Sequence, residues 1–419
     1  MTSRDAGALL AAGQGVETCA TTGGPARPNA EQYATPSLPP PMAGLSVTRM
    51  LLYSAGSVGT GAFYAFNNFV LPPVLQALGA SNLLIGLLSS TRSIEGALIQ
   101  PTIGAWSDRV WSPFGRRRPF LVVAIPLAAV FFLLAAAVHS LAPLAVAIIL
   151  FSIFFNVAAD PYAALLADTA PLHQRGLLSG LSTAVQLISQ VGFLLLVASA
   201  SAGGNVPAWA YGLVATILVV GFGVTVVGVP ERRGGAVEHQ RLPLRTYLAA
   251  LLVERQAVRY LLTIFVYTLG LNAILPYLVL FITDDIHASE QTAFVLSAVL
   301  MLVMAVSATV FGKLADRIGA KRVLVFGWTI LAVCAGGGVL VRTVPQTVVV
   351  VLLAGLGNGA ATAVTWPLLT MLIPHEKTGV FAGLKAAAES VAIPLSVVVA
   401  AEIFLPTFGY RGIFAMLAL

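Results

Sequence analysis

The sequence predicts an all-α membrane protein that crosses the bilayer many times and consists of two similar halves. Of its 419 residues, 58% are hydrophobic and 10% are charged, and the mean hydropathy is +0.90. Soluble domains carry about 25% charged residues. Apolar runs long enough for a membrane helix, roughly 20 residues, follow one another from residue 47 onward. These runs are too long for the strands of a membrane β-barrel and do not alternate in polarity.

The apolar segments form two sets, which define the expected domains. Residues 1–46 are rich in Pro, Gly, Ala and Thr, and we expect a disordered cytoplasmic tail there. We expect an N-terminal six-helix bundle over 47–229, a polar cytoplasmic linker over 230–260 and a C-terminal bundle over 261–419. The last segment is too short to span, so we expect the chain to end inside its twelfth helix. The predicted segments are 47–78, 82–106, 120–140, 143–167, 177–201, 206–229, 261–283, 291–314, 323–341, 346–373, 379–405 and 411–419.

The basic residues predict which end of the helices faces the cytoplasm. We count every second connection between segments, of which residues 107–119 form the first. Together with the N-terminal tail, these connections hold 19 of the 23 Lys and Arg residues. The opposite connections hold little beyond Arg342 and Arg411. The positive-inside bias therefore places the N-terminus and the arginine-rich loops in the cytoplasm, and we expect an integral inner-membrane protein. Because the arginines lie in short loops, the net charge of +6 does not indicate a nucleic-acid partner.

One charged loop motif occurs once in each half. Residues 104–109 read GAWSDR, and residues 312–317 read GKLADR. Both copies are followed by glycine and basic residues, as GRRR at 115–118 and as GAKR at 319–322. Two six-helix halves joined by a polar linker are typical of a transporter with its site between the halves, near the middle of the membrane. Asparagines also recur between the two halves, at offsets that lie between 202 and 208 residues: Asn68 recurs as Asn272, and Asn156 recurs as Asn358.

The repeated loop resembles the loop motif of the major facilitator superfamily. The longer first copy, with GALIQPTIGAWSD at 96–108 and PYAALLAD at 161–168, resembles the plant sucrose–proton symporters and the related glycoside–pentoside–hexuronide transporters. The resemblance implies the major facilitator fold, with two six-helix bundles related by a pseudo-two-fold axis. The chain departs from the sucrose symporters at Tyr162, where they carry an arginine. The resemblance therefore supports the architecture more than sucrose as the substrate.

The resemblance also implies that the loop is a cytoplasmic latch. Asp108 and Asp316 would accept hydrogen bonds from arginines and from a helix N-terminus, and glycine would allow close helix approach. Positive-inside bias alone explains Arg118 and Lys321. Asp168 and Glu402 lie nearer helix ends, and we expect surface roles for both. The expected gate residues are Gly104, Asp108, Arg109, Arg116, Arg117, Gly312, Asp316, Arg317 and Arg322.

Ionisable residues inside membrane segments are costly and therefore indicate function. Arg92 and Glu95 share a helix face at i,i+3, and Lys385 and Glu389 do so at i,i+4. We expect Glu95, Asp160 or Glu389 to carry the coupled proton, because a neighbouring cation that moves can switch a buried carboxyl group. Arg92 or Lys385 would be that neighbour or would bind substrate hydroxyls. The alternative is that both pairs are static ion pairs inside the bundle.

Amide and aromatic side chains suit a sugar, which offers hydroxyl edges and C–H faces. Plain packing and interface anchoring explain the aromatics as well, and helix–helix hydrogen bonds explain the asparagines. The substrate-binding candidates are Asn68, Arg92, Asn156, Tyr162, Asn272, Asn358, Trp366 and Lys385, with Tyr64, Asn67 and Tyr277 as further possibilities.

Three functions compete at this point. The first is proton-coupled import of a sugar, a disaccharide or a glycoside, by alternating access. The second is proton-driven export of a drug or metabolite, but segment 177–201 lacks the GPxxGG-like motif typical of such exporters. The third is a membrane enzyme or receptor, but no HExxH, GxSxG or P-loop pattern occurs. We therefore expect a monomeric carrier of protons and a sugar-like molecule that uses no cofactor or metal.

The coupling assignment makes the first testable prediction. Glu95→Gln or Glu389→Gln should abolish uphill uptake while sparing exchange, because a carboxamide cannot release a proton. Proteoliposome flux with and without a pH gradient measures this. Unchanged uphill transport in both variants would contradict the assignment.

Overall fold

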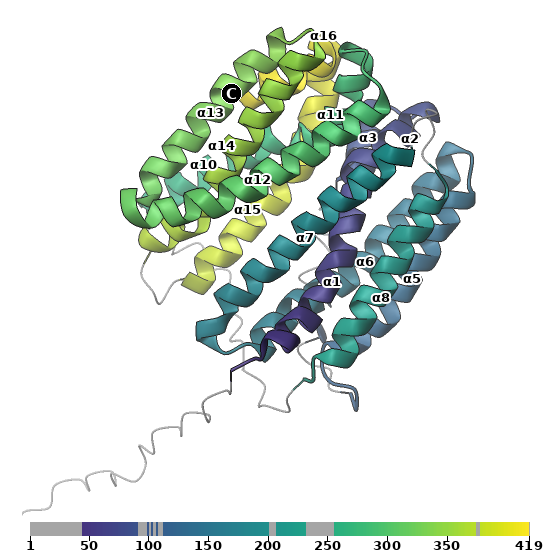
Figure 1. Cartoon of the computed structure of the whole chain (residues 1–419), viewed down its shortest axis with the longest axis vertical. Helices are drawn as coiled ribbons and strands as arrows, with labels where there is room; N and C mark the ends of the chain where they lie inside the picture. Colours follow the sequence, from purple (N-terminus) through teal and green to yellow (C-terminus); the bar gives the residue numbers. More distant parts are fainter. Residues whose placement is uncertain are drawn as a thin grey trace, which may run out of the picture. The chain divides into compact units, whose positions relative to one another are not determined.

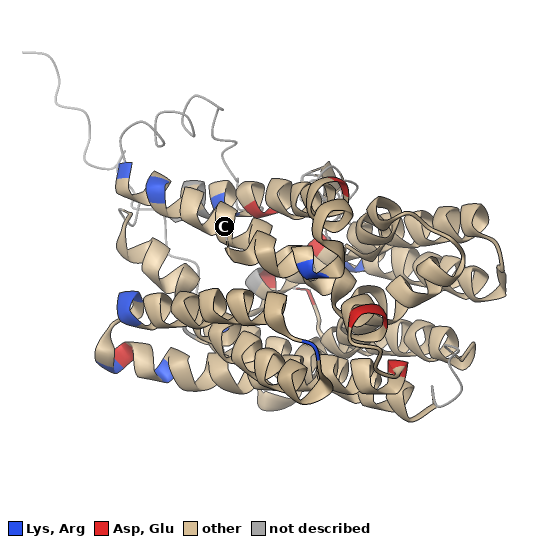
Figure 2. Ribbon diagram, turned by 90° about the horizontal axis from the view of Figure 1, so that it is seen from above, with Lys and Arg blue, Asp and Glu red and all other residues tan. Residues whose placement is uncertain are grey.

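The computed structural model describes residues 44–90, 99, 102–103, 106–107, 112–200, 207–231, 255–373 and 378–418. The chain divides into the units Met1–Met42 and Ala43–Leu419, and only the second contains described residues. Within them, nine helices are long and apolar enough to cross a membrane. Figure 2 shows how few charged residues interrupt these helices.

The first half begins with a helix that changes its winding. α1 (Val47–Ala65) starts at Ser46, whose side chain accepts a hydrogen bond from the Arg49 N–H. It continues through the π-helix η2 (Phe66–Val70) into α2 (Leu71–Ala77), and α3 (Asn82–Ser89) follows after a turn. Pro72 and Pro73 lie in the first turn of α2 and lack the N–H that a regular helix would use. Four longer helices complete the described part of this half: α5 (Arg118–Ala137), α6 (Leu141–Thr169), α7 (Leu172–Ala200) and α8 (Trp209–Gly228).

The second half repeats this pattern with a matching interruption. α10 (Arg255–Asn272) gives way to the 3-10 helix η3 (Leu275–Tyr277), the short α11 (Leu278–Leu280) and the π-helix η4 (Phe281–Asp285). The repeated asparagine and proline landmarks therefore mark an irregular helix in both halves. The remaining elements are α12 (Glu290–Ile318), α13 (Ala320–Leu340), α14 (Val344–Met371), α15 (Thr378–Val399), η6 (Ala400–Phe404), α16 (Leu405–Phe408), η7 (Gly409–Arg411) and α17 (Gly412–Ala418).

Most predicted segments match these helices in order. The largest difference is at 261, because the helix already begins at Arg255 and its polar first turn carries no hydropathy signal. The predicted segment 82–106 lies largely outside the described residues, as do the tail and most of the linker. The last predicted segment, 411–419, contains the short helix α17.

Small residues set the packing inside each half. α1 packs on α7 and α8, and α5 packs on α6 and α8. At Gly61 a Cβ atom would collide with the backbone carbonyl of Gln186 on α7. In the second half α14 packs on α12 and α13, while α10 packs on α15. Close backbone approach of this kind supplies van der Waals contact, which must replace the hydrophobic drive that is missing between helices in lipid.

The two halves meet along α7 and α12, which pack side by side (Figure 1). A second contact joins α3 to α15. There, Gly86 on α3 lies against the Tyr277 hydroxyl and the Val397 side chain. These contacts place α15, which carries an ion pair described below, beside α3 of the first half.

Gly61→Ala should destabilise the protein, because its methyl group meets a rigid backbone carbonyl. Overpacking of this kind costs about 1–3 kcal/mol, and the melting temperature in detergent should fall by several degrees. Gly192→Ala on α7 is the matched control, since nothing lies within 4 Å of the added Cβ. The control should keep or slightly raise the melting temperature, because alanine favours helix. Equal effects of both changes would contradict the packing argument.

Candidate functional site

A polar cleft of about 290 Å³ lies among three helices of the second half. It falls just below the range of roughly 300–1,000 Å³ typical of small-molecule pockets. α10 contributes amide, hydroxyl and phenol groups, α14 contributes threonines and a tryptophan, and α15 contributes an ion pair. The lining residues are Ile264, Tyr267, Thr268, Leu271, Asn272, Thr362, Thr365, Trp366, Lys385, Glu389 and Ile393.

The ion pair on α15 is the charged part of this cleft. Lys385 Nζ lies 2.5 Å from Glu389 Oε1, with the two residues one helical turn apart. Their side chains are 18% and 22% exposed, so both reach the cleft while remaining mostly covered. A pair this close is net neutral, which lowers the cost of placing two charges within a membrane helix. The predicted spacing on one face of the helix is confirmed.

Asn358 lies behind the cleft wall and holds the Tyr267 side chain. The Tyr267 hydroxyl donates to Asn358 Oδ1 at 2.7 Å, and the Thr362 hydroxyl donates to the same oxygen at 3.1 Å. The Asn358 amide nitrogen lies 3.2 Å from the sulfur of Met304. Asn358 is therefore placed to position Tyr267 and Thr362, both of which line the cleft.

Asn272 and Trp366 complete the polar and aromatic lining. The Asn272 side-chain nitrogen donates to the Thr268 carbonyl at 2.8 Å. The Oδ1 atom of Asn272 takes no part in that bond and remains an acceptor. Trp366 is 40% exposed and lines the cleft. Our sequence reasoning named four of the lining residues and missed Tyr267 and the threonines. The i,i+4 spacing of Thr268 with Asn272, and of Asn358 with Thr362, was the available signal.

The candidates in the first half lie elsewhere, and several are engaged in packing. The Tyr162 hydroxyl donates to the Tyr53 carbonyl at 2.8 Å and lies 2.8 Å from the Ser57 hydroxyl. Its ring stacks on that of Tyr53 with centroids 4.8 Å apart. Tyr162 thus joins α6 to α1, and its role in substrate binding stays a prediction.

Asn156 is buried on α6 and donates to the Ser152 carbonyl at 2.9 Å. Asn68 is half-buried in η2, and Asp160 is half-buried on α6. Arg92 and Glu95 lie outside the described residues. Substrate or proton binding by these five residues stays a prediction.

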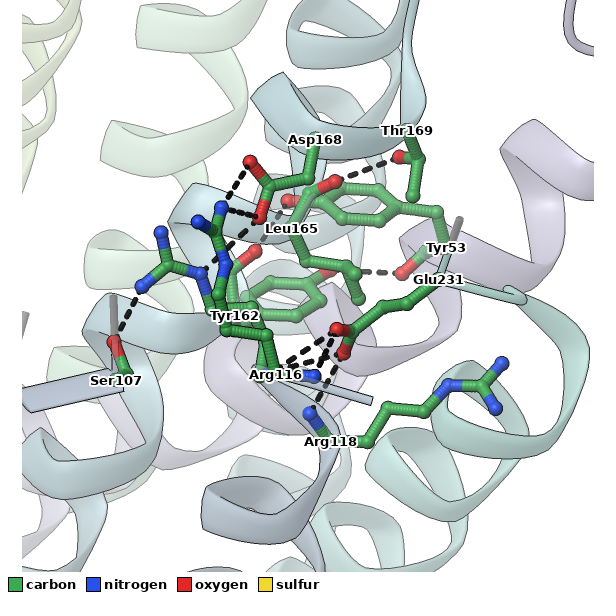
Figure 3. Close-up of polar contacts among 10 residues, drawn as sticks. Tyr53, Ser107, Arg116, Arg118, Tyr162, Leu165, Asp168, Thr169 and Glu231 are labelled. Atoms are coloured by element: carbon green, nitrogen blue, oxygen red, sulfur yellow. Dashed lines mark hydrogen bonds and ion pairs between the residues drawn. The ribbon is translucent and has the colours of Figure 1, made fainter. Parts of the chain in front are cut away.

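The arginine cluster of the first half is joined by two acids (Figure 3). Arg116 Nη2 donates to both carboxylate oxygens of Asp168 at 2.8 Å, and Arg117 Nε donates to Asp168 at 3.2 Å. The nearly buried Arg117 guanidinium also donates to the Ser107 hydroxyl. Asp168, for which we expected a surface role, is 29% exposed at the end of α6 and pairs with both arginines.

Glu231 is the second acid, and sequence reasoning missed it. Its carboxylate accepts the backbone N–H groups of Arg116, Arg117 and Arg118 at the start of α5, the last two at 2.9 and 2.8 Å. A carboxylate at a helix N-terminus satisfies donors that the helix itself leaves free. The Arg118 guanidinium donates to the Val229 carbonyl, so this arginine does more than set topology. We call Arg116, Arg117, Asp168 and Glu231 the arginine clasp.

The second copy of the loop motif is arranged differently. Asp316, Arg317 and Arg322 are exposed, and no ion pair joins them to another described residue. Gly312 is half-buried, with Ala363 of α14 as its neighbour. Gly104, Asp108 and Arg109 of the first copy lie outside the described residues. A latch between the two copies therefore stays a prediction.

Four hydrogen bonds join the two halves at the end of the helices opposite the arginine clasp. Gln76 Nε2 donates to Asp284 at 2.6 Å and to the Tyr410 hydroxyl at 3.3 Å. The Tyr277 hydroxyl donates to the Asn82 carbonyl at 2.8 Å, and the Tyr410 hydroxyl donates to Asn82 Oδ1 at 3.5 Å. Gln76 of α2 and Asn82 of α3 therefore contact residues of η3, η4 and η7 in the second half. We call these five residues the distal gate.

Comparison with known proteins fits these observations. The family described as MFS/sugar transport protein matches residues 52–414. The human proton-associated sugar transporter A is 47% identical over 60 residues, which are 14% of this chain and 8% of that protein. A sucrose transport protein of Oryza sativa subsp. indica is 33% identical over 90 residues, which are 21% of this chain and 15% of that protein. These matched segments are a small part of either relative.

Solved structures match over a much larger share. A D-xylose–proton symporter has a TM-score of 0.66 at 15% identity and covers 88% of this chain and 94% of its own. The nucleoside transporter NupG has a TM-score of 0.68 at 12% identity, with 88% and 96% covered. At such low identity these likenesses bear on the fold alone. Together with the match over residues 52–414, they establish that the chain is an integral, multi-pass membrane protein of the MFS/sugar transport protein family, with the major facilitator fold.

Proposed function

We propose that this protein carries a sugar, a disaccharide or a glycoside, across the membrane together with a proton by alternating access, and is not an enzyme. The polar cleft on α10, α14 and α15 is the observation that carries the proposal. It combines amide and hydroxyl groups, an aromatic face and an ion pair within membrane helices. The relatives, a proton-associated sugar transporter and a sucrose transport protein, point to the same substrate class.

The chemistry of the cleft favours a neutral, hydroxyl-rich substrate. Because Lys385 and Glu389 cancel each other's charge, an ionic substrate would leave a net charge inside the membrane. The Asn272 Oδ1 and the hydroxyl oxygens of Thr362 and Thr365, whose own protons are donated within the helices, can accept hydrogen bonds from sugar hydroxyls. Trp366 offers a flat apolar surface for the C–H face of a sugar ring. A drug-like apolar substrate would offer no donor to these acceptor oxygens and would cover them from water, which costs affinity.

Topology follows from the positive-inside bias. We place the arginine clasp and the N-terminus in the cytoplasm and the distal gate outside the inner membrane. The two bundles, 47–229 and 261–419, would move as units about the cleft, with 230–260 as a cytoplasmic linker and the monomer as the working form. Near mid-membrane, a site at the interface of two such repeats can be reached from each side in turn.

The contacts described above assign different roles to the two ends. The arginine clasp bonds within the first half, so it braces α5, α6 and α8 as one body. The distal gate joins the two halves, so it must break for the cleft to open outward. In the other state we propose that the repeated loops, with Asp108 and Asp316 as acceptors, close the cytoplasmic end. Each state would thus have its own set of bonds, and a ligand shifts the balance only by binding one state better.

Trp366→Ala should weaken sugar binding about ten-fold, since it removes the aromatic face, a loss of the order of 1.4 kcal/mol. The measurement is a thermal-shift screen of purified protein with sucrose, maltose, D-glucose and D-xylose, followed by titration of whichever sugar stabilises it. Trp209→Ala, on an exposed face of α8, is the matched control. Stabilisation of the wild type by none of these sugars would contradict the proposed function.

Loss of the distal gate should favour the outward-open state. In Gln76→Ala with Tyr410→Phe, three of the four bonds are lost: two neutral ones worth about 0.5–1.5 kcal/mol each and the one to the Asp284 carboxylate worth about 1.5–3 kcal/mol. A cysteine at Thr268, with Cys19 and Cys334 replaced by serine, should then react several-fold faster with an impermeant maleimide added from the distal side.

Thr407→Ala provides the control for this experiment. It is exposed near the same end, and among the described residues its hydroxyl bonds only to the Ile403 carbonyl, one turn earlier in the chain. The control should leave the labelling rate unchanged. An unchanged rate in the gate variant as well would show that these bonds do not hold the two halves together.

A further inference from the structure

Three serine hydroxyls are buried without a partner near the second contact between the halves. Ser89 and Ser396 are fully covered, and Ser90 is 8% exposed. Among the described residues, the Oγ atom of each makes no hydrogen bond. A serine in a helix can bond to the carbonyl one turn before it, as the Ser297 hydroxyl does to the Ala293 carbonyl at 2.9 Å. A buried hydroxyl that makes no such bond is costly, because it has lost its water without gaining an acceptor or a donor.

Helical periodicity turns Ser89 and Ser90 of α3 towards the second half. Asn82 accepts a hydrogen bond from η3, and one turn later a Cβ atom on Gly86 would meet the Val397 side chain of α15. Residues three and four positions further along a helix lie on the same face. Ser89 and Ser90 therefore continue the face that Asn82 and Gly86 begin, one turn deeper in the membrane.

Ser396 lies on the opposing helix, α15, directly before Val397 in the chain. It follows the cleft-lining residues Glu389 and Ile393 by seven and three positions, so it shares their face of the helix. Because α15 continues towards the distal gate, Ser396 lies between that gate and the cleft. We call Ser89, Ser90 and Ser396 the serine seam. It follows the contact between α3 and α15, which joins the two halves.

The serine seam and the distal gate have opposite effects on this contact. At the distal gate, separation of the halves breaks hydrogen bonds that the closed state makes. At the serine seam, the closed state makes no hydrogen bond that separation could break. Separation instead lets water reach the hydroxyls, and water can both donate to and accept from each of them. Opening on the distal side therefore loses hydrogen bonds at the gate and gains them at the seam.

We propose that the serine seam destabilises the state in which the distal side is closed, and so keeps the carrier near the balance point between its two states. The inference rests on the proposed alternating access and identifies residues that set its equilibrium without binding the sugar. A ligand shifts such an equilibrium only by its difference in affinity for the two states. The smaller the free-energy gap, the smaller the difference that a sugar must supply.

Replacing all three serines by alanine should make the distal side open less often. Alanine removes the uncompensated hydroxyls from the closed state, and water then gains less when the halves separate. The cysteine at position 268, with Cys19 and Cys334 replaced by serine, reports this through its reaction with an impermeant maleimide from the distal side. Because the rate follows the open fraction, we expect labelling about ten-fold slower than in the same chain with the serines intact.

Ser297→Ala is the matched control for the alanine substitutions. Its hydroxyl is as buried as those of the seam, but it is bonded within α12 and keeps that bond whichever side is open. The control should leave the labelling rate unchanged. Ser89→Ala with Ser90→Ala, compared with Ser396→Ala alone, divides the effect between the two helices.

The melting temperature of the purified triple variant provides a second measurement. If the hydroxyls have no partner in the closed state, their removal should raise the melting temperature, whereas Ser297→Ala should not. A raised melting temperature with an unchanged labelling rate would overturn the inference, because the hydroxyls would then be buried in both states. A lowered melting temperature would also overturn it, since it would show that the hydroxyls are bonded in the closed state.

Failure of this inference is distinguishable from failure of the proposed function. If the position-268 cysteine of the otherwise unchanged chain never reacts from the distal side, with or without sucrose, maltose, D-glucose or D-xylose, alternating access itself is contradicted. If that cysteine does react and the triple variant labels at the same rate, alternating access stands and only the role of the serine seam is lost.

Discussion

The cost of placing charge in hydrocarbon governs most of what the described helices do. Apart from Lys385, the described arginines and lysines lie near helix ends, and in the first half Asp168 and Glu231 are partners of the arginines there. At the arginine clasp, Asp168 and Glu231 neutralise a cluster that would otherwise repel itself and leave three backbone N–H groups free. Within the membrane helices of the second half, the charges of Lys385 and Glu389 cancel. The same cost makes that pair sensitive, since a proton on one partner leaves the other uncompensated.

Helix packing has to achieve stability without the usual hydrophobic drive. Glycines bring α1 so close to α7 and α8 that an added Cβ would meet backbone atoms of the neighbouring helix. Irregular turns occur where α1 and α10 end, at the repeated asparagine and proline positions. Backbone groups freed at such turns need partners inside the protein, so irregular backbone occurs only where protein or a cavity covers it. Close helix packing and covered irregular turns thus both follow from the absence of water in the bilayer core.

The two ends of the described structure differ in what they connect. The arginine clasp joins α5, α6 and the end of α8, all within the first half. The distal gate joins the first half to the second through Gln76 and Asn82, using neutral donors and one carboxylate. Neutral hydrogen bonds are individually weak, at about 0.5–1.5 kcal/mol. Bonds of this strength suit a contact that forms and breaks during transport, whereas the clasp, with two arginines on one carboxylate, suits a permanent brace.

The sequence by itself determined the fold class, the helix order and the i,i+4 pairing of Lys385 with Glu389, because hydropathy and helical periodicity are local properties. It also named Asn272, Trp366 and Asn358 as polar candidates. It did not predict that Tyr162 packs against Tyr53, that Asp168 and Glu231 share the arginines, or that Tyr267 lines the cleft beside Lys385. Those outcomes depend on which helix faces which. Helices of similar hydropathy cannot be told apart as packing partners from their sequences. The close approach of their backbones in three dimensions selects which helices pack together.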